Sequence, residues 1–288
     1  MAGWLRLCAR MTGFLLFLAG TTLLALALRV LDYLTGSTID RTPWAGRCFR
    51  VGCRCLGLRI RHHGVQPAQN TLIVSNHVSW CDIPILGAFA PARFLSKAEV
   101  GQWPLIGWLA RQAGTLFIQR GSGQARRVRT GIEEALKRGE SVTIFPEGTT
   151  SAGITVLPFH GLLLKAATAA DVPVQPATIA YRRNGRPDHV APFIGDDEFH
   201  HHLTTLLKQP SADVDVLFHQ PVEIPETATA HEAAAELRAT VHNGLERIYR
   251  GEMDQPSAPG DLRTEDAPGR SHLPSPPDAP QSQGQSTA

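Results

Sequence analysis

Residues 71–82 read TLIVSNHVSWCD. The first five form a short run of apolar and β-branched side chains, which is typical of a strand. The run ends at Asn76 and His77, and Asp82 follows the histidine at a distance of five positions. We expect His77 to lie where the strand ends and Asp82 to lie on the first turn of a following helix. A strand that leads through polar residues into a helix favours an α/β fold, in which functional residues gather at strand ends.

The alternation of strands and helices continues along the chain. Further short strands are predicted at 58–61, 93–96, 115–119, 141–145, 174–181 and 214–218. Helices are predicted at 124–138 and at 231–250, and the inner face of the second carries Leu237, Val241, Leu245 and Ile248. We therefore expect one domain over residues 42–250, an α/β fold from about residue 45 in which a mixed sheet is flanked by helices.

The N-terminal segment is a candidate membrane anchor. From Met11 to Leu28 the chain has 18 residues without a charge, flanked by Arg6, Arg10 and Arg29. That length is near the lower limit for crossing a bilayer. A secretory signal peptide is the alternative, because ALA at 25–27 resembles a cleavage site. The apolar run is longer than a signal-peptide core and an arginine-rich region follows it, so we favour a retained membrane-anchoring helix within residues 1–41.

Residues 42–57 predict a basic amphipathic helix directly after the anchor. Thr42 is the expected N-cap, with Pro43 in the first helical position and Gly57 as the end. The expected apolar stripe consists of Trp44, Cys48, Val51 and Cys55, beside a face that carries Arg47, Arg50 and Arg54. Such a helix suits an anionic leaflet, although a core-packing helix with solvated arginines fits equally well. The arginines favour the inner membrane, with the downstream domain on the cytoplasmic side.

Composition restricts the remaining possibilities. With 28 Lys and Arg against 26 Asp and Glu, the chain shows no basic excess that would indicate nucleic-acid binding. The five cysteines include only a Cys53-x-Cys55 pair, which lacks the spacing of a zinc ribbon or redox site, so we interpret them as reduced and structural. Residues 251–288 are rich in Pro, Ser, Gly and Gln and are predicted to be a disordered tail.

His77 and Asp82 could carry acid–base chemistry. A carboxylate that binds one ring nitrogen of a histidine fixes the tautomer and stabilises the imidazolium, so the other nitrogen can act as a general base. Such a pair can take the proton from a hydroxyl group that a substrate supplies, and the enzyme then needs no nucleophile of its own. A histidine and an aspartate at this spacing are common by chance, however, and alone they indicate little.

Four ordered blocks give the pair a context. The first, of the form N-H-x-S-x-x-D, is matched by Asn76, His77, Ser79 and Asp82. The second, F-I-x-R, is matched by Phe117, Ile118 and Arg120. The third, F-P-E-G-T, is matched by residues 145–149, and the fourth, V-P-x-x-P, by Val172, Pro173 and Pro176. Over about residues 50–225 the chain thus resembles the glycerolipid acyltransferases, the family of 1-acylglycerol-3-phosphate acyltransferases and their relatives.

The resemblance implies transfer of a fatty acyl group from acyl-CoA or acyl carrier protein to the free hydroxyl of a membrane lysolipid. His77 would take the hydroxyl proton and Asp82 would orient His77. Arg120 would bind an anionic group of the acceptor, and Glu147 would help to seat the acceptor, with Gly148 allowing close approach of the backbone. Thr149 and Ser79 would complete the substrate-binding set. Neither a metal ion nor a bound organic cofactor is implied.

Two positions in and after the third block bear on the identity of the acceptor. The resemblance favours 1-acylglycerol-3-phosphate, with phosphatidate as the product. Members that act on lysophosphatidate usually continue the third block with arginine, whereas this chain has Thr150, and His160 stands where a lysine is common. Both differences lower the positive charge where a phosphate would bind. The alternative acceptors are another lysophospholipid or a lyso-ornithine lipid.

Two other classes of function stay open. A non-catalytic lipid-binding membrane protein could use the same anchor and basic helix, and it would tolerate the loss of His77. A lipid hydrolase could use His77 and Asp82 to activate water, and it would release fatty acid without a lysolipid. The four blocks make both alternatives minor.

Overall fold

Eight strands form one sheet in the computed structural model, which describes residues 1–118, 125–195 and 197–254. In chain order they are β1 (Leu58–Gly64), β2 (Leu72–Ser75), β3 (Arg93–Lys97), β4 (Leu116–Ile118), β5 (Val142–Ile144), β6 (Val174–Arg183), β7 (Arg186–Pro187) and β8 (Ala212–Phe218). Their order across the sheet is β1-β8-β6-β2-β5-β3-β4, with β7 paired to β6. Strand β6 is antiparallel to β7 and β8, and the other pairs are parallel. The predicted mixed sheet is confirmed.

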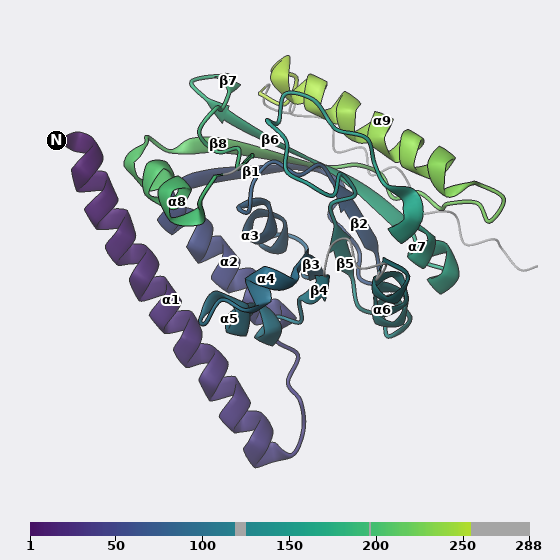
Figure 1. Ribbon diagram of the computed structural model, residues 1–288, viewed down its shortest axis with the longest axis horizontal. Helices are drawn as coiled ribbons and strands as arrows, with labels where there is room; N and C mark the ends of the chain where they lie inside the picture. The colour runs from purple at the N-terminus through teal and green to yellow at the C-terminus, as the bar shows by residue number, and fades with distance from the viewer. Residues whose placement is uncertain (119–124, 196, 255–288) are drawn as a thin grey trace, which may run out of the picture. The chain divides into compact units, whose positions relative to one another are not determined.

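Helices cover both faces of this sheet (Figure 1). One layer contains α2 (Thr42–Leu56), α3 (Asp82–Gly87) and α8 (Phe199–Lys208), with α1 (Ala2–Thr35) packed against α2 and α8. The other contains α6 (Ala125–Lys137), α7 (Lys165–Ala170) and α9 (Ala230–Tyr249). The short helices α4 (Ala98–Gly101) and α5 (Ile106–Gln112) connect β3 to β4. Successive strand residues face opposite sides, so Ile73 packs in the α2 layer and Leu72 and Val74 in the α9 layer.

The parallel strands position the functional residues. Strands β2, β5 and β3 lie side by side, and their carboxyl ends therefore meet at one edge of the sheet. His77 follows β2, Phe145 follows β5 and Lys97 ends β3. This edge is where sites form on open α/β sheets, and the expectation that His77 lies at a strand end is confirmed.

The basic helix forms where it was predicted, but it buries a different face. Helix α2 begins at Thr42 and Arg41 precedes it, so the expected N-cap was wrong by one residue. The buried positions are Gly46, Gly52, Cys53 and Leu56, while Val51 of the predicted apolar stripe is 46% exposed. Glycine allows this close packing, because a Cβ atom on Gly52 would lie 3.0 Å from the ring of Phe17 in α1.

Helix α1 is tied to the domain at its N-terminal end. Arg6 donates to the carbonyl oxygen of Lys208 at 3.1 Å, and Arg10 donates to that of Gln209 at 2.8 Å. Both acceptors lie at the C-terminal end of α8, where backbone carbonyls lack partners within their own helix. With 34 residues, α1 is long and apolar enough to cross a membrane. That α1 is a retained membrane anchor stays a prediction.

We expect Gly161→Ala to destabilise the fold. Gly161 begins the 3₁₀ helix η1 (Gly161–Leu163), and a Cβ atom at this position would lie 1.9 Å from the carbonyl oxygen of Ala230, where α9 starts. Because both groups belong to the backbone, the contact can be relieved only by moving whole elements, at about 1–3 kcal/mol. Thermal unfolding of the purified protein should show a lower Tm.

Gly131→Ala is the matched control. Gly131 lies inside α6, and a Cβ atom there would have no atom within 4 Å other than those of the neighbouring residues and backbone of its own helix. Alanine should stabilise the helix by about 0.5–1 kcal/mol, because glycine loses more backbone freedom on folding. An equal change in Tm for the two variants would contradict the close contact between η1 and α9.

Candidate active site

His77 and Asp82 form a hydrogen-bonded pair. Nδ1 of His77 lies 2.8 Å from Oδ2 of Asp82. The imidazole is 17% exposed and the carboxylate is fully buried. Asp82 is the first residue of α3, as expected, and the short loop 76–81 brings it back to the histidine. With Nδ1 bound to the carboxylate, Nε2 points away from Asp82 and is the nitrogen left to act as a base.

The carboxylate of Asp82 accepts three further hydrogen bonds. The backbone N–H groups of Val78 and Ser79 donate to Oδ2 at 2.7 and 2.9 Å. The hydroxyl of Tyr181, on β6, donates to Oδ1 at 2.5 Å. These four donors fix the position of the carboxylate beside His77. Asp82 can therefore stabilise an imidazolium at His77.

Phe145 and Glu147, in the third block, hold the histidine from the other side. The ring of Phe145 stacks on that of His77, with 4.1 Å between centroids and 15° between planes. The buried carboxylate of Glu147 accepts from the backbone N–H of His77 at 2.7 Å and from that of Leu157 at 3.1 Å. The two carboxylate oxygens of Glu147 therefore position the backbone at His77 and at Leu157. That Glu147 also helps to seat the acceptor stays a prediction. The hydrogen bonds to backbone N–H groups indicate that Glu147 acts on the acceptor indirectly, by positioning His77.

Glu147 titrates in an unusual range. Burial raises the pKa of its carboxyl to about 7, against the opposing effect of the His77 and Leu157 N–H groups. The usual pKa is 4.5, so between these two values the unfolded chain is ionised while the folded protein keeps the proton. The contribution of Glu147 to stability therefore falls as the pH rises from 4.5 to about 7.

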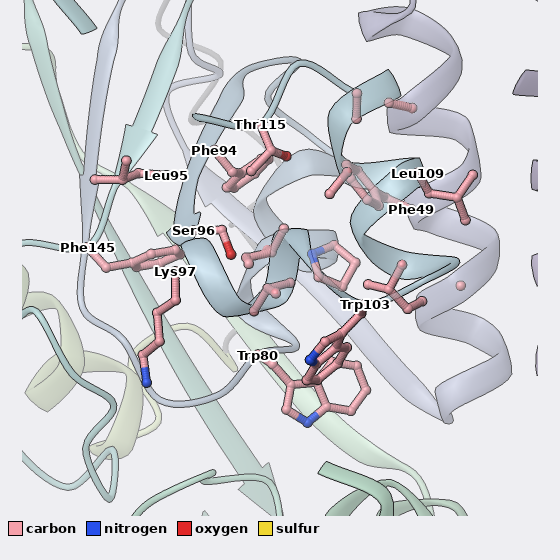
Figure 2. Close-up of a pocket in the computed structure, with 18 of the residues that line it drawn as sticks. Phe49, Trp80, Phe94, Leu95, Ser96, Lys97, Trp103, Leu109, Thr115 and Phe145 are labelled. Atoms are coloured by element: carbon pink, nitrogen blue, oxygen red, sulfur yellow. The ribbon is translucent and has the colours of Figure 1, made fainter. Parts of the chain in front are cut away.

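A large apolar cavity opens beside His77. Its volume is about 1220 Å³, above the range of about 300–1000 Å³ that is usual for small-molecule sites. Helices α1, α2 and α5 supply much of the wall, through Phe14, Leu24, Leu28, Trp44, Cys48, Ile106 and Leu109. Figure 2 shows Phe145 and Lys97 on one side of this pocket and Trp80 and Trp103 on the other. The walls suit one or two long alkyl chains.

Polar residues lie among the apolar ones. The lining includes Lys97, Glu99, His160 and Asp197, so charges of both signs face the same space. Thr150 lines it too, and its hydroxyl donates to the carbonyl oxygen of Phe193. The position at which a family member acting on a phosphate would carry arginine therefore holds a hydroxyl that is already hydrogen-bonded within the protein.

The structure brings several of the predicted site residues together. Gly148, with a φ of 70°, and Thr149 line the cavity together with His77. Ser79 is fully buried, and its backbone contacts Asp82: its N–H donates to the carboxylate and its carbonyl oxygen accepts from the N–H of Asp82. Arg120 lies outside the described residues, as does the predicted tail beyond residue 254. The binding roles of these residues stay predictions.

Two residues of the site were not expected from the sequence. The sequence predicts Tyr181 only as part of a strand and Phe145 only as a residue of the third block. A tyrosine in a buried strand needs a hydrogen-bond acceptor, and this need is the one local signal that could have pointed to Tyr181. Its partner Asp82 is 99 positions away in the chain, so the sequence could not identify it.

Comparison with known proteins shows similarity to acyltransferases. A family model described as acyltransferase matches residues 59–180. A lyso-ornithine lipid O-acyltransferase of Pseudomonas aeruginosa is 52% identical over 170 residues, which cover 59% of this chain and 66% of the relative. One of Rhodobacter capsulatus is 34% identical over 259 residues, covering 85% and 92%. The crystal structure of the 1-acyl-sn-glycerophosphate acyltransferase PlsC from Thermotoga maritima shares the fold, with a TM-score of 0.58 at 23% identity over 83% of this chain and 97% of that one.

Proposed function

Because the chain belongs to the acyltransferase family, we propose that it transfers a fatty acyl group from an acyl thioester to the hydroxyl of a lyso-ornithine lipid. Acyl transfer itself follows from the family. The sequence favoured 1-acylglycerol-3-phosphate as the acceptor and kept lyso-ornithine lipid as an alternative. The similarity to lyso-ornithine lipid O-acyltransferases along most of the chain now favours the alternative.

The observation that carries the mechanism is the His77–Asp82 pair at the wall of a large apolar cavity. Nε2 of His77 takes the proton from the acceptor hydroxyl as its oxygen forms a bond to the thioester carbonyl carbon. The carbon–sulfur bond then breaks, and the leaving thiolate receives the proton from His77. Asp82 stabilises the imidazolium between these two transfers. The donor is acyl-CoA or acyl carrier protein, and no resident cofactor takes part in this scheme.

Charges along the cavity support the acceptor class. Ornithine carries a carboxylate and an ammonium group at neutral pH. Lys97 can pair with the carboxylate, while Glu99 and Asp197, both exposed lining residues, can pair with the ammonium. A phosphate group could also pair with Lys97, but the same two carboxylates would repel it, and Thr150 offers it no positive charge. The mixed charges therefore fit a zwitterionic head group better than a phosphate.

The apolar helix α1 and the lipid-modifying relatives indicate a membrane protein. We place the catalytic domain on the cytoplasmic side, where the acyl thioesters are made. The arginines of α2 support this side, since Arg47 and Arg54 follow the anchor directly and basic residues favour the cytoplasmic face. Protease accessibility of the domain in sealed inner-membrane vesicles of defined orientation tests the assignment.

We expect lyso-ornithine lipid to be the preferred acceptor when membranes that contain the protein are given a labelled acyl thioester and a set of lysolipids. In the double variant Glu99→Gln/Asp197→Asn, kcat/KM for lyso-ornithine lipid should fall about tenfold, because the ammonium loses charge-assisted partners. Activity on lysophosphatidate should stay level or rise. The measurement is initial rate against acceptor concentration for both lipids.

The double variant Glu236→Gln/Asp213→Asn is the control. It also removes one glutamate charge and one aspartate charge, but from α9 and β8, at residues that do not line the cavity. It should leave the preference unchanged. Wild-type activity confined to lysophosphatidate would overturn the proposed acceptor, whereas no transfer to any lysolipid would favour a lipid-binding protein.

A further inference from the structure

Tyr181 is a buried ionisable group to which the transfer scheme above gives no role. Its side chain is 1% exposed, and burial, followed by the nearby charge of Asp82, raises the pKa of its hydroxyl well above 10. The phenol therefore stays protonated at any working pH and acts as a hydrogen-bond donor. The acceptor is Oδ1 of Asp82, at 2.5 Å.

Asn76 places Tyr181 beside the pair. Strand β6 runs past the end of β2, where Ser75 is opposite Ala177. Beyond that point the side chain of Asn76 continues the pairing: its Nδ2 donates to the carbonyl oxygen of Ile179 at 2.9 Å, and its Oδ1 accepts from the N–H of Ile179 at 2.8 Å. Tyr181 comes two residues later and so faces the same side of the sheet as Ile179, toward α3.

The two oxygens of Asp82 accept hydrogen bonds from different groups. Oδ2 faces His77 and two backbone N–H groups, whereas Oδ1 faces Tyr181. We propose that Tyr181 is a positioning residue for acyl transfer, which holds Oδ2 toward His77 and sets the strength of the base through its hydrogen bond to Asp82. This inference rests on the proposed role of His77 as the general base.

The electrostatic part of this role has a defined sign. A hydrogen bond from a phenol draws negative charge toward Oδ1 and leaves less on Oδ2. Without it, Oδ2 carries more negative charge and Asp82 attracts the imidazolium more strongly. The acidic limb of the profile of kcat/KM against pH, which reports the base of the free enzyme, should then move to higher pH. A residue that only fills space would not move this limb.

Other groups around the Tyr181–Asp82 pair must be considered in such a profile. Among the described residues that face it, the titratable side chains are His77 after β2, Glu147 after β5, Cys81 before α3 and Cys53 in α2. Burial raises the pKa of Cys53 to about 12 and that of Cys81 well above its usual 9, so both stay neutral. Glu147, with a pKa of about 7, titrates in the working range. The effect of Tyr181 must therefore be taken as a difference between matched variants.

The test is Tyr181→Phe, which removes the hydroxyl and keeps the ring. We expect kcat to fall about tenfold, which corresponds to one hydrogen bond to a charged group, with little change in KM for the acceptor. The acidic limb should move up by about half a pH unit or more. Combined with His77→Ala, the substitution should cause no further loss, because Tyr181 acts through His77.

Tyr249→Phe is the matched control, since the Tyr249 hydroxyl donates to the carbonyl oxygen of Gly153 at 2.7 Å, outside the pair. It should leave both kcat and the limb as in the wild type. If Tyr181→Phe does not fold, 3-fluorotyrosine can be incorporated in a Tyr33→Phe/Tyr249→Phe background. The stronger donor should then move the limb to lower pH.

The role of Tyr181 would be overturned if Tyr181→Phe had a rate within twofold of the wild type, or a lower rate with an unmoved acidic limb. A loss of activity in His77→Ala would still support the general base in that case. If His77→Ala itself transfers acyl groups normally, the proposed mechanism fails, and the role of Tyr181 fails with it. The two failures are therefore distinguishable.

Discussion

Replacing His77 with alanine is expected to lower the rate of acyl transfer by about 10³-fold, because the acceptor hydroxyl loses its general base. The fold should survive. The imidazole lies at the wall of the cavity, and the contacts of its backbone with Glu147 and Ser151 do not depend on the ring. Transfer from labelled acyl thioester to lyso-ornithine lipid, normalised to the amount of protein in the membrane, measures the effect.

His201→Ala is the control for this variant. His201 lies on α8 with a side chain that is 75% exposed, so its loss should change neither rate nor stability. Residual activity of His77→Ala close to that of His201→Ala would refute the general-base assignment. Such a result would leave a lipid-binding role as the better interpretation of the cavity.

The second large effect is expected for Asp82→Asn, which should lower kcat by about 10²-fold or more. An asparagine can offer its amide oxygen to His77, Val78 and Ser79, but its NH2 group then replaces the oxygen that accepts from Tyr181. The neutral amide also no longer balances the charge of an imidazolium. A buried N–H group without an acceptor also costs about 1–3 kcal/mol. Both kcat and Tm should therefore fall, in contrast to His77→Ala.

Asp213→Asn is the control for Asp82→Asn, because it makes the same substitution at a carboxylate whose partner is one arginine. Asp213 pairs with Arg59 at 2.8 Å, and both side chains are partly exposed. Exposed pairs of this kind contribute about 0–1 kcal/mol, so Tm should change little and kcat should be unaffected. If Asp82→Asn retained the wild-type kcat, the histidine would not depend on its carboxylate, and the interpretation of the pair would be wrong.

Much of the fold could be predicted because its signals are local. The predicted strands each overlap a strand of the sheet, and α9 buries the four residues expected on its inner face, Leu237, Val241, Leu245 and Ile248. Hydrophobic periodicity reports the side of an element that faces the core. Helix α2 shows the limit of this argument. Its buried face is set by glycines that let α1 and α3 approach closely. A hydrophobicity scale does not predict this face, because it does not measure the space that a small residue leaves for a neighbouring helix.

The site divides in the same way. The sequence by itself determined the α/β class, the position of His77 at a strand end and the spacing that lets Asp82 fold back to it, because five residues of chain can only reach a short distance. Only the tertiary structure decided that Tyr181 completes the surroundings of Asp82, that Phe145 stacks on His77 and that α1 forms a wall of the cavity. These contacts join residues that are far apart in the chain, and they exist only once the sheet has brought β2, β5 and β6 together.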